Sequence, residues 1–236
     1  MILRFIFAFL IFFLIVGGIH FYIYFRLNHF FKFAQLKWII ISLGILLPAG
    51  FIGSRMSHNY LTIILNWFSS IWMGIMFFLL STLLIYEIIR LFVKLSPITW
   101  GIIVLSIVAA VSLVAIINGQ FIVTNELTIE LENINKPLKI VQLSDIHFGV
   151  IHNSNFLEKI VKKTNAQNPD LVLITGDLFD SVKVAQKKGV PELKLLNAKT
   201  FFVSGNHDLY ENISVIKKLL SENDVQFLSD ELVEYK

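Results

Sequence analysis

The pattern of hydrophobic and polar positions divides the chain near residue 119. In the first part, four apolar stretches approach the about 20 residues that a helix needs to cross the hydrocarbon core of a bilayer. They are Phe5–Phe25, Trp38–Ile52, Leu61–Tyr86 and Pro97–Ile117. The second is the shortest and contains Gly44 and Pro48, so it fits either a kinked span or a re-entrant segment. We expect residues 1–119 to form an α-helical membrane domain of about four transmembrane helices.

From Lys139 onward, short β-rich runs alternate with amphipathic segments, a pattern that favours a layered α/β domain. The predicted strands are Lys139–Ser144, Leu171–Thr175, Thr200–Ser204 and Val225–Leu228, and the predicted helices are Asn155–Gln167 and Ile213–Ser221. Residues 120–137 are expected to be a linker with a short β segment. Residues 138–236 then form the folded C-terminal domain.

The composition supports this division. The chain is 56% hydrophobic and only 16% charged, which is outside the range of ordinary soluble proteins. Residues 1–119 have a net charge of +6 and residues 120–236 a net charge of −3, so the overall +3 is an average of unlike parts. Because basic residues are not gathered on the folded domain, we expect no nucleic-acid partner. The absence of cysteine excludes disulfides and thiolate ligands, which leaves His, Asp, Glu and Asn for any metal site.

The basic residues in the short loops predict the orientation of the membrane domain. One side carries Arg26, Lys32, Lys37, Arg90 and Lys94, and the other carries Arg4 and Arg55. By the positive-inside rule the first side is cytoplasmic, and an even number of spans then places both termini outside. We therefore expect an integral, multi-pass membrane protein whose C-terminal domain is extracytoplasmic.

Few ionisable residues lie within the apolar stretches, which argues against a transporter. His20, His29 and His58 are interpreted as rings close to the ends of the stretches, where they reach the headgroup region. Glu87 is interpreted as the partner of Arg90 at helical spacing.

Polar clusters directly follow the first three predicted strands, which is where open α/β sheets place ligands. Asp145 and His147 are two residues apart and can chelate one metal ion from a turn. Asp177 follows a glycine and can bridge two cations. Asn206 can supply a neutral carbonyl ligand, and His207 can supply a proton near a leaving group. The first two clusters are common by chance when taken alone, but the three together favour a functional site.

These residues resemble the calcineurin-like metallophosphoesterases, whose pattern is Asp-x-His, then Gly-Asp, then Gly-Asn-His followed by Asp or Glu. The resemblance covers about Leu138–Leu228. The residues around the motifs, Ser144 to Gly149 and Thr175 to Asp180, are most similar to the membrane-attached branch of that family. Some members of that branch act on lipid-linked or nucleotide-sugar diphosphates.

The resemblance implies a site for two divalent metal ions. Asp145 and His147 would bind the first ion, Asp177 would bridge both ions, and Asn206 would bind the second. The ligand types suit Mn, Fe and Zn alike, so they leave the identity of the metal open.

The resemblance also implies catalytic roles for two neighbouring residues. His207 would stabilise the transition state or protonate the leaving oxygen, and Asp208 would orient His207. Asp180 is interpreted as a helix N-cap and His152 as an exposed loop histidine.

Members of the family continue with a further metal-binding histidine and a Gly-His-x-His motif, whereas this chain has no histidine after His207. We therefore expect an incomplete α/β metallophosphoesterase sandwich: a truncated open reading frame, a fragment, or a protein completed by a second polypeptide.

The predicted function is that of a membrane-anchored, metal-dependent phosphoesterase. Its expected partners are membrane lipid and phosphate mono- or diesters, lipid-linked phosphates and nucleotide-sugar diphosphates among them; the oligomeric state stays open. The alternative is a catalytically inactive, truncated membrane protein in which the spans carry the function.

Overall fold

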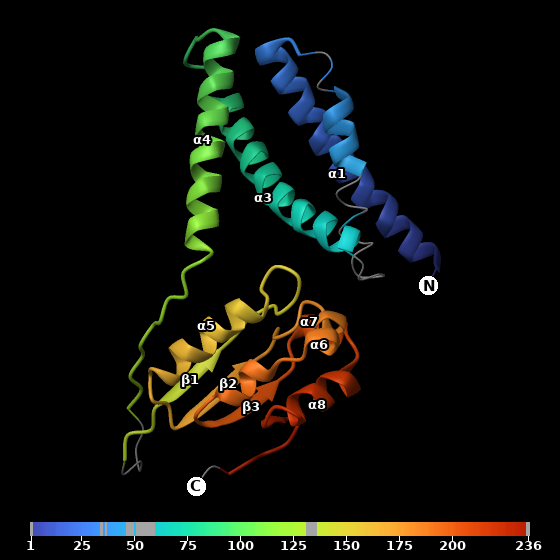
Figure 1. The fold of residues 1–236 in the computed structure, drawn as a ribbon. Helices are drawn as coiled ribbons and strands as arrows, with labels where there is room; N and C mark the ends of the chain where they lie inside the picture. Colours follow the sequence, from blue (N-terminus) through green and yellow to red (C-terminus); the bar gives the residue numbers. More distant parts are fainter. Residues whose placement is uncertain are drawn as a thin grey trace. The chain divides into compact units, whose positions relative to one another are not determined.

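The computed structural model describes residues 2–33, 35, 37–45, 50, 60–130 and 136–234. The chain divides into two compact units, Met1–Ile122 and Val123–Lys236 (Figure 1). The first unit is helical, and the second contains a sheet with helices.

The helical unit contains three long apolar helices, α1 (Ile2–Phe31), α3 (Tyr60–Ile89) and α4 (Pro97–Asn118). In the part of the chain that the structure describes, three segments are long and apolar enough to cross a membrane: Leu10–Phe31, Leu61–Ile89 and Pro97–Asn118. They correspond to three of the four predicted stretches. The remaining one, Trp38–Ile52, lies partly outside the described residues, and its residues 38–45 are helical.

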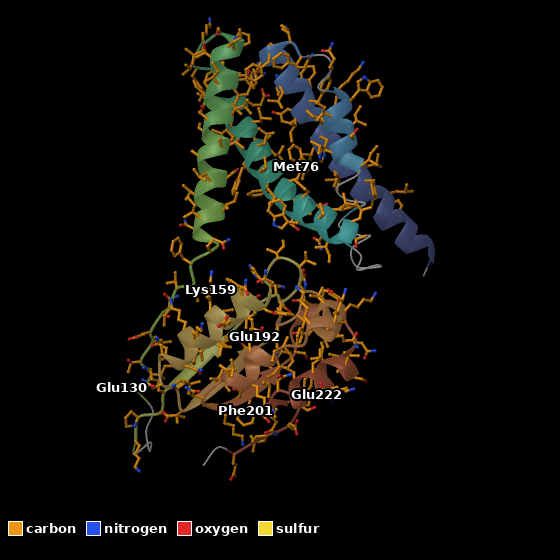
Figure 2. All side chains as sticks on the ribbon, in the orientation of Figure 1. Met76, Glu130, Lys159, Glu192, Phe201 and Glu222 are labelled. Carbon is orange, nitrogen blue, oxygen red and sulfur yellow. The ribbon has the colours of Figure 1, made fainter. Side chains whose placement is uncertain are left out.

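Aromatic and aliphatic side chains form the interior of this unit. Ile23 and Leu83 are completely buried, and Met76 packs against the same cluster (Figure 2). The ring of Tyr86 makes edge contacts with Phe30 on α1, at 5.1 Å between centroids, and with Trp100 on α4, at 5.2 Å. Tyr86 therefore connects all three long helices.

Glu87 is the centre of a charged network near the ends of α1 and α3. Its carboxylate accepts from Arg90 Nε at 2.6 Å and from the Tyr22 hydroxyl at 2.9 Å, and it pairs with Arg26. The predicted pairing with Arg90 is confirmed. The partners on α1 were not predicted, because they lie more than 60 residues away along the chain.

The position predicted for His20 is wrong: it lies well inside the span Leu10–Phe31 and is only 4% exposed. Its Nε2 accepts a hydrogen bond from Trp72 Nε1 at 3.0 Å, so its Nδ1 carries the proton and donates to the Val16 carbonyl at 2.7 Å. Both ring nitrogens therefore have partners within the bundle. His58 lies outside the described residues.

The second unit is built on a four-stranded parallel sheet with strand order β1-β2-β3-β4. The strands are β1 (Ile140–Leu143), β2 (Leu171–Thr175), β3 (Lys199–Val203) and β4 (Val225–Phe227). The α/β architecture expected from the sequence is confirmed, and the structure adds that the strands are parallel. Because the strands are parallel and adjacent in chain order, their carboxyl ends meet at the same edge of the sheet.

The crossovers between strands are helical (Figure 1). They are α5 (Ser154–Asn165), α6 (Val182–Lys188), the 3-10 helix η1 (Pro191–Leu195), α7 (Asn206–Leu209) and α8 (Ile213–Ser221). The sequence predicted α5 and α8, which have clear apolar faces. For α6 (Val182–Lys188) it predicted only a helix start, one residue early at Asp180. It did not predict η1 and α7, which are too short to show a helical period. The described residues 121–130 and 137 have no regular structure, and residues 131–135 of the predicted linker lie outside the described part.

The two faces of the sheet differ in burial. Val172, Ile174 and Phe202 share one face and are at most 1% exposed. On the other face Phe201, which is labelled in Figure 2, is 5% exposed, whereas Ile140 and Val203 are 46% and 41% exposed. Right-handed crossovers between neighbouring parallel strands place their helices on one face, which accounts for the difference.

Candidate metal centre

The loops after β1 and β2 continue the pairing of the two strands beyond the end of the sheet. The amides of Asp145, His147 and Phe148 donate to the carbonyls of residues 176, 177 and 178, at 3.2, 2.9 and 2.7 Å. Asp145, His147 and Asp177 have left-handed backbone angles, with φ of 56°, 51° and 52°. Such conformations cost about 1 kcal/mol or more each in a non-glycine residue, and they cluster at functional sites.

Two glycines allow the loops after β2 and β3 to touch. Gly176 has φ of 93°, and a Cβ on it would lie 2.8 Å from Gly205. A Cβ on Gly205 would in turn lie 2.6 Å from the amide nitrogen of Asp177 and would overlap its carboxylate. Only glycine therefore fits at these two positions, and this close approach brings the second and third polar clusters together.

Asp145, His147 and Asp177 form a group whose potential ligand atoms all lie within 4.8 Å of one another. Asp145 is 68% exposed, and its Oδ1 is 4.0 Å from His147 Nε2. Asp177 Oδ1 also accepts from the amide of His207 at 2.9 Å, which ties the carboxylate to the loop after β3. Two carboxylates and an imidazole are a donor set that suits Mn, Fe or Zn, so these residues fit a divalent metal.

His207 faces this group from α7, the short helix that follows β3. Its ring lies 4.7 Å from the ring of His147, and its Nδ1 is 3.8 Å from Asp180 Oδ1. His147, Asp180 and His207 make up a second group of potential ligand atoms within 4.8 Å. Asn206 is the first residue of α7 and is exposed. The three clusters predicted from the sequence thus meet at the carboxyl edge of the sheet.

Asp208 is completely buried below this surface. Its Oδ2 accepts from the amides of Asp177 at 2.7 Å and Gly205 at 2.9 Å, and its Oδ1 accepts from the amide of Phe179 at 3.1 Å. Three backbone donors from two loops thus converge on one carboxylate. Asp208 holds the loop after β2 against the loop after β3.

Residues 138–234 match the family model described as calcineurin-like phosphoesterase. The match covers most of the C-terminal unit. Members of this family are metal-dependent phosphoester hydrolases, and the His and Asp groups at the edge of the sheet fit the divalent metals that the family uses.

Relatives of the phosphoesterase region include membrane proteins. An uncharacterised metallophosphoesterase of Campylobacter jejuni is 40% identical over 97 residues, which are 40% of this chain and 26% of that protein. A transmembrane protein with metallophosphoesterase domain from Bos taurus is 38% identical over 99 residues, 41% of this chain and 22% of that protein. UDP-2,3-diacylglucosamine pyrophosphatase of Chlamydia muridarum is 36% identical over 80 residues, 33% of this chain and 24% of that protein.

The chain spans 26% and 30% of the lengths of the first two relatives that it matches. No solved structure matches it significantly.

Two interpretations of residues near the phosphoesterase site are wrong. Ser181, and not Asp180, is the N-cap residue of α6. The position of Asp180, three residues after Asp177 in the same loop, was the sequence signal that it belongs to the site. His152 is not an exposed loop histidine: it is partly buried, its Nδ1 lies 2.8 Å from the Ile146 carbonyl, and its ring stacks on Phe156 at 4.3 Å.

Proposed function

We propose that this chain carries the site of a membrane-anchored, metal-dependent phosphoesterase that binds two divalent ions. The observation that carries the proposal is the meeting of Asp145, His147 and Asp177 within 4.8 Å at the carboxyl edge of the sheet, with His207 beside them. These residues come from separate parts of the chain. The left-handed turns and the glycine contact that bring them together are costly to maintain without a function.

The metal ligands would divide between the two ions. Asp145 and His147 would hold the first, Asp177 would contact both, and Asn206 would contribute its side-chain oxygen to the second. When bound, such ions activate water and stabilise negative charge on phosphoryl oxygens.

His207 would supply a proton to the leaving oxygen, since its ring lies beside the group of metal ligands. Asp180 approaches Nδ1 of that ring at 3.8 Å, so we assign the orientation of His207 to Asp180. Asp208 would act as an internal brace for the loops, because its carboxylate is occupied by three backbone amides.

A lipid-linked phosphate or a nucleotide-sugar diphosphate is the substrate class that we propose. Two features support it: the helices of the first unit are apolar enough to lie in a membrane, and one relative is named as a pyrophosphatase of a diacylated sugar nucleotide. An enzyme held at a membrane meets lipid-linked substrates at high local concentration. The positive-inside charge pattern further supports an extracytoplasmic site.

The test is metal content together with hydrolysis of an aryl phosphodiester by the purified full chain with added Mn²⁺. We expect bound metal and turnover in the wild-type chain, and loss of both in Asp177→Ala. Asp224→Ala is the control, because Asp224 is an exposed carboxylate (73%) in the turn before β4 and should change neither quantity. If the wild-type chain shows neither metal nor turnover, the alternative of an inactive membrane protein is favoured.

A further inference from the structure

A pocket of about 220 Å³ lies in the membrane unit, at the end of the bundle where α1 and α3 finish and α4 begins. Its lining includes His29 from α1, Arg90 and Lys94 from the connection after α3, and Trp100 from α4. At about 30 Å³ per water molecule it has room for roughly seven waters. This is below the roughly 300 to 1,000 Å³ of pockets for drug-sized ligands, so the pocket suits one compact polar group.

The described lining of this pocket includes two cationic side chains, Arg90 and Lys94, and no carboxylate. Glu87 is the one acidic residue in the sequence of 1–119, and it is shared by Arg26 and Arg90. Together, Arg26, Arg90, Lys94 and Glu87 have a net charge of +2. Among the described residues, no acidic side chain pairs with Lys94. An anion is therefore the ligand that the charge favours.

The surroundings of the pocket are apolar. Leu91 and Phe92, directly after Arg90, are 70% and 82% exposed. The buried rings of Tyr86 and Trp100 form part of the wall, and such rings are common at the headgroup level of membranes. A soluble anion would leave the exposed apolar residues without a function. A ligand with a charged head and apolar chains would use both features.

We propose that this pocket binds the phosphate group of an anionic phospholipid. Arg90 and Lys94 would donate to the phosphate oxygens, and the acyl chains would lie against Phe92 and its apolar neighbours. Basic pockets between transmembrane helices bind lipid headgroups in this way. The site is separate from the proposed metal centre, so it does not depend on phosphoesterase activity.

The test compares lipid binding by the full chain in a neutral detergent, measured by native mass spectrometry. The probes are phosphatidylglycerol and phosphatidylcholine with identical acyl chains. The wild-type chain should prefer phosphatidylglycerol, and Lys94→Gln should weaken that binding about fivefold, the effect of one basic residue near an anionic lipid. Binding of phosphatidylcholine should not change.

Lys32→Gln is the matched control, because Lys32 is an exposed lysine just after α1 that does not line the pocket. It should change phosphatidylglycerol binding by less than about twofold, well under the effect of a direct contact. Helical circular dichroism will confirm that both variants fold. Equal affinity for the two lipids, or equal losses in the two variants, would overturn the proposal.

Inorganic phosphate distinguishes a lipid site from a site for a soluble anion. Phosphatidylglycerol should stay bound when inorganic phosphate is added at the same concentration, because the acyl chains contribute to its binding. Displacement of the lipid under these conditions would overturn the assignment to a phospholipid.

Discussion

At the scale of single residues, the site depends on carboxylates with different tasks. Asp145 is exposed and Asp177 reaches across to the next loop, as expected of metal ligands. Asp208 is buried and bonded to backbone, and Asp180 lies beside an imidazole. The surroundings of each aspartate therefore suggest a different role: binding a metal ion, holding two loops together, or positioning His207.

The proposed positioning role of Asp180 can be separated from a structural role. His207→Ala should lower turnover by about 10² to 10⁴, the usual contribution of a general acid, without removing the metal. Asp180→Asn should also lower turnover. If Asp180 acts through His207, adding Asp180→Asn to His207→Ala should cause no further loss. Independent, multiplicative losses in the double variant, with metal content measured alongside, would show that Asp180 does not act through His207.

The ligand roles predict a graded loss of metal. Asp177→Ala should reduce the metal bound per chain more than Asp145→Ala or Asn206→Ala, because Asp177 alone would contact both ions. Inductively coupled plasma mass spectrometry on the purified variants measures this directly. Equal metal content in the three variants would contradict the bridging role.

Asp208→Ala should destabilise the site without removing any proposed ligand. It leaves the buried amides of Asp177, Phe179 and Gly205 without an acceptor, at a cost of about 3 kcal/mol or more in the free energy of opening. Hydrogen exchange of these amides should accelerate accordingly. Asp170→Ala is the control, since the bond from the Lys139 amide to Asp170 is exposed and should contribute about 1 kcal/mol or less. Unchanged exchange in Asp208→Ala would contradict the role of a brace.

At the scale of elements, parallel strands account for the position of the site. The loops after β1, β2 and β3 meet because their strands are adjacent and point the same way. The distance between the second and third loops is then limited by Gly176 and Gly205. The loops after β2 and β3 can therefore approach each other this closely only because both residues are glycines.

Gly205→Ala should therefore separate the two loops. The added Cβ would be 2.6 Å from the Asp177 nitrogen, and backbone atoms cannot move away as a flexible side chain can. We expect a loss of metal affinity of at least tenfold, about 1.4 kcal/mol, measured by titration with Mn²⁺. In Gly149→Ala the nearest contact is a side-chain carbon at 3.3 Å, so a smaller effect is expected. Equal affinities in the two variants would show that the glycine contact does not limit the site.

At the scale of the whole molecule, the direction of the helices bears on membrane topology. The C-terminal ends of α1 and α3 line the same pocket, so these helices run in the same direction. Between these two helices, the described residues 37–45 are helical. This supports the proposal of four crossings, in which the end of α4 and the phosphoesterase unit follow on the extracytoplasmic side.

Single cysteines test this topology cleanly, because the native chain has none. Ser229→Cys in the phosphoesterase unit should react with a membrane-impermeant maleimide in intact cells. Lys32→Cys, after α1, should react only after the membrane is permeabilised. The opposite pattern of labelling would reverse the proposed orientation. Labelling of both positions in intact cells would contradict the three crossings that are expected between them.

Local patterns in the sequence determined which segments are apolar helices, where the four strands lie to within one residue at each end, and which polar clusters follow three of those strands. These features depend on side chains within a few residues of one another, so periodicity and composition are sufficient to detect them. The expectation of a common site rested on the position of these clusters directly after successive strands of an α/β sheet.

Only the tertiary structure decided the partners of individual polar groups. Asp208 accepts amides from residues 31 and 29 positions away, and His20 accepts from Trp72 at a separation of 52. The sequence specified these residue types but not which of them meet, because a hydrogen bond depends on positions set by the packing of whole elements. For the same reason, neither the brace formed by Asp208 nor the pocket beside Trp100 was foreseen.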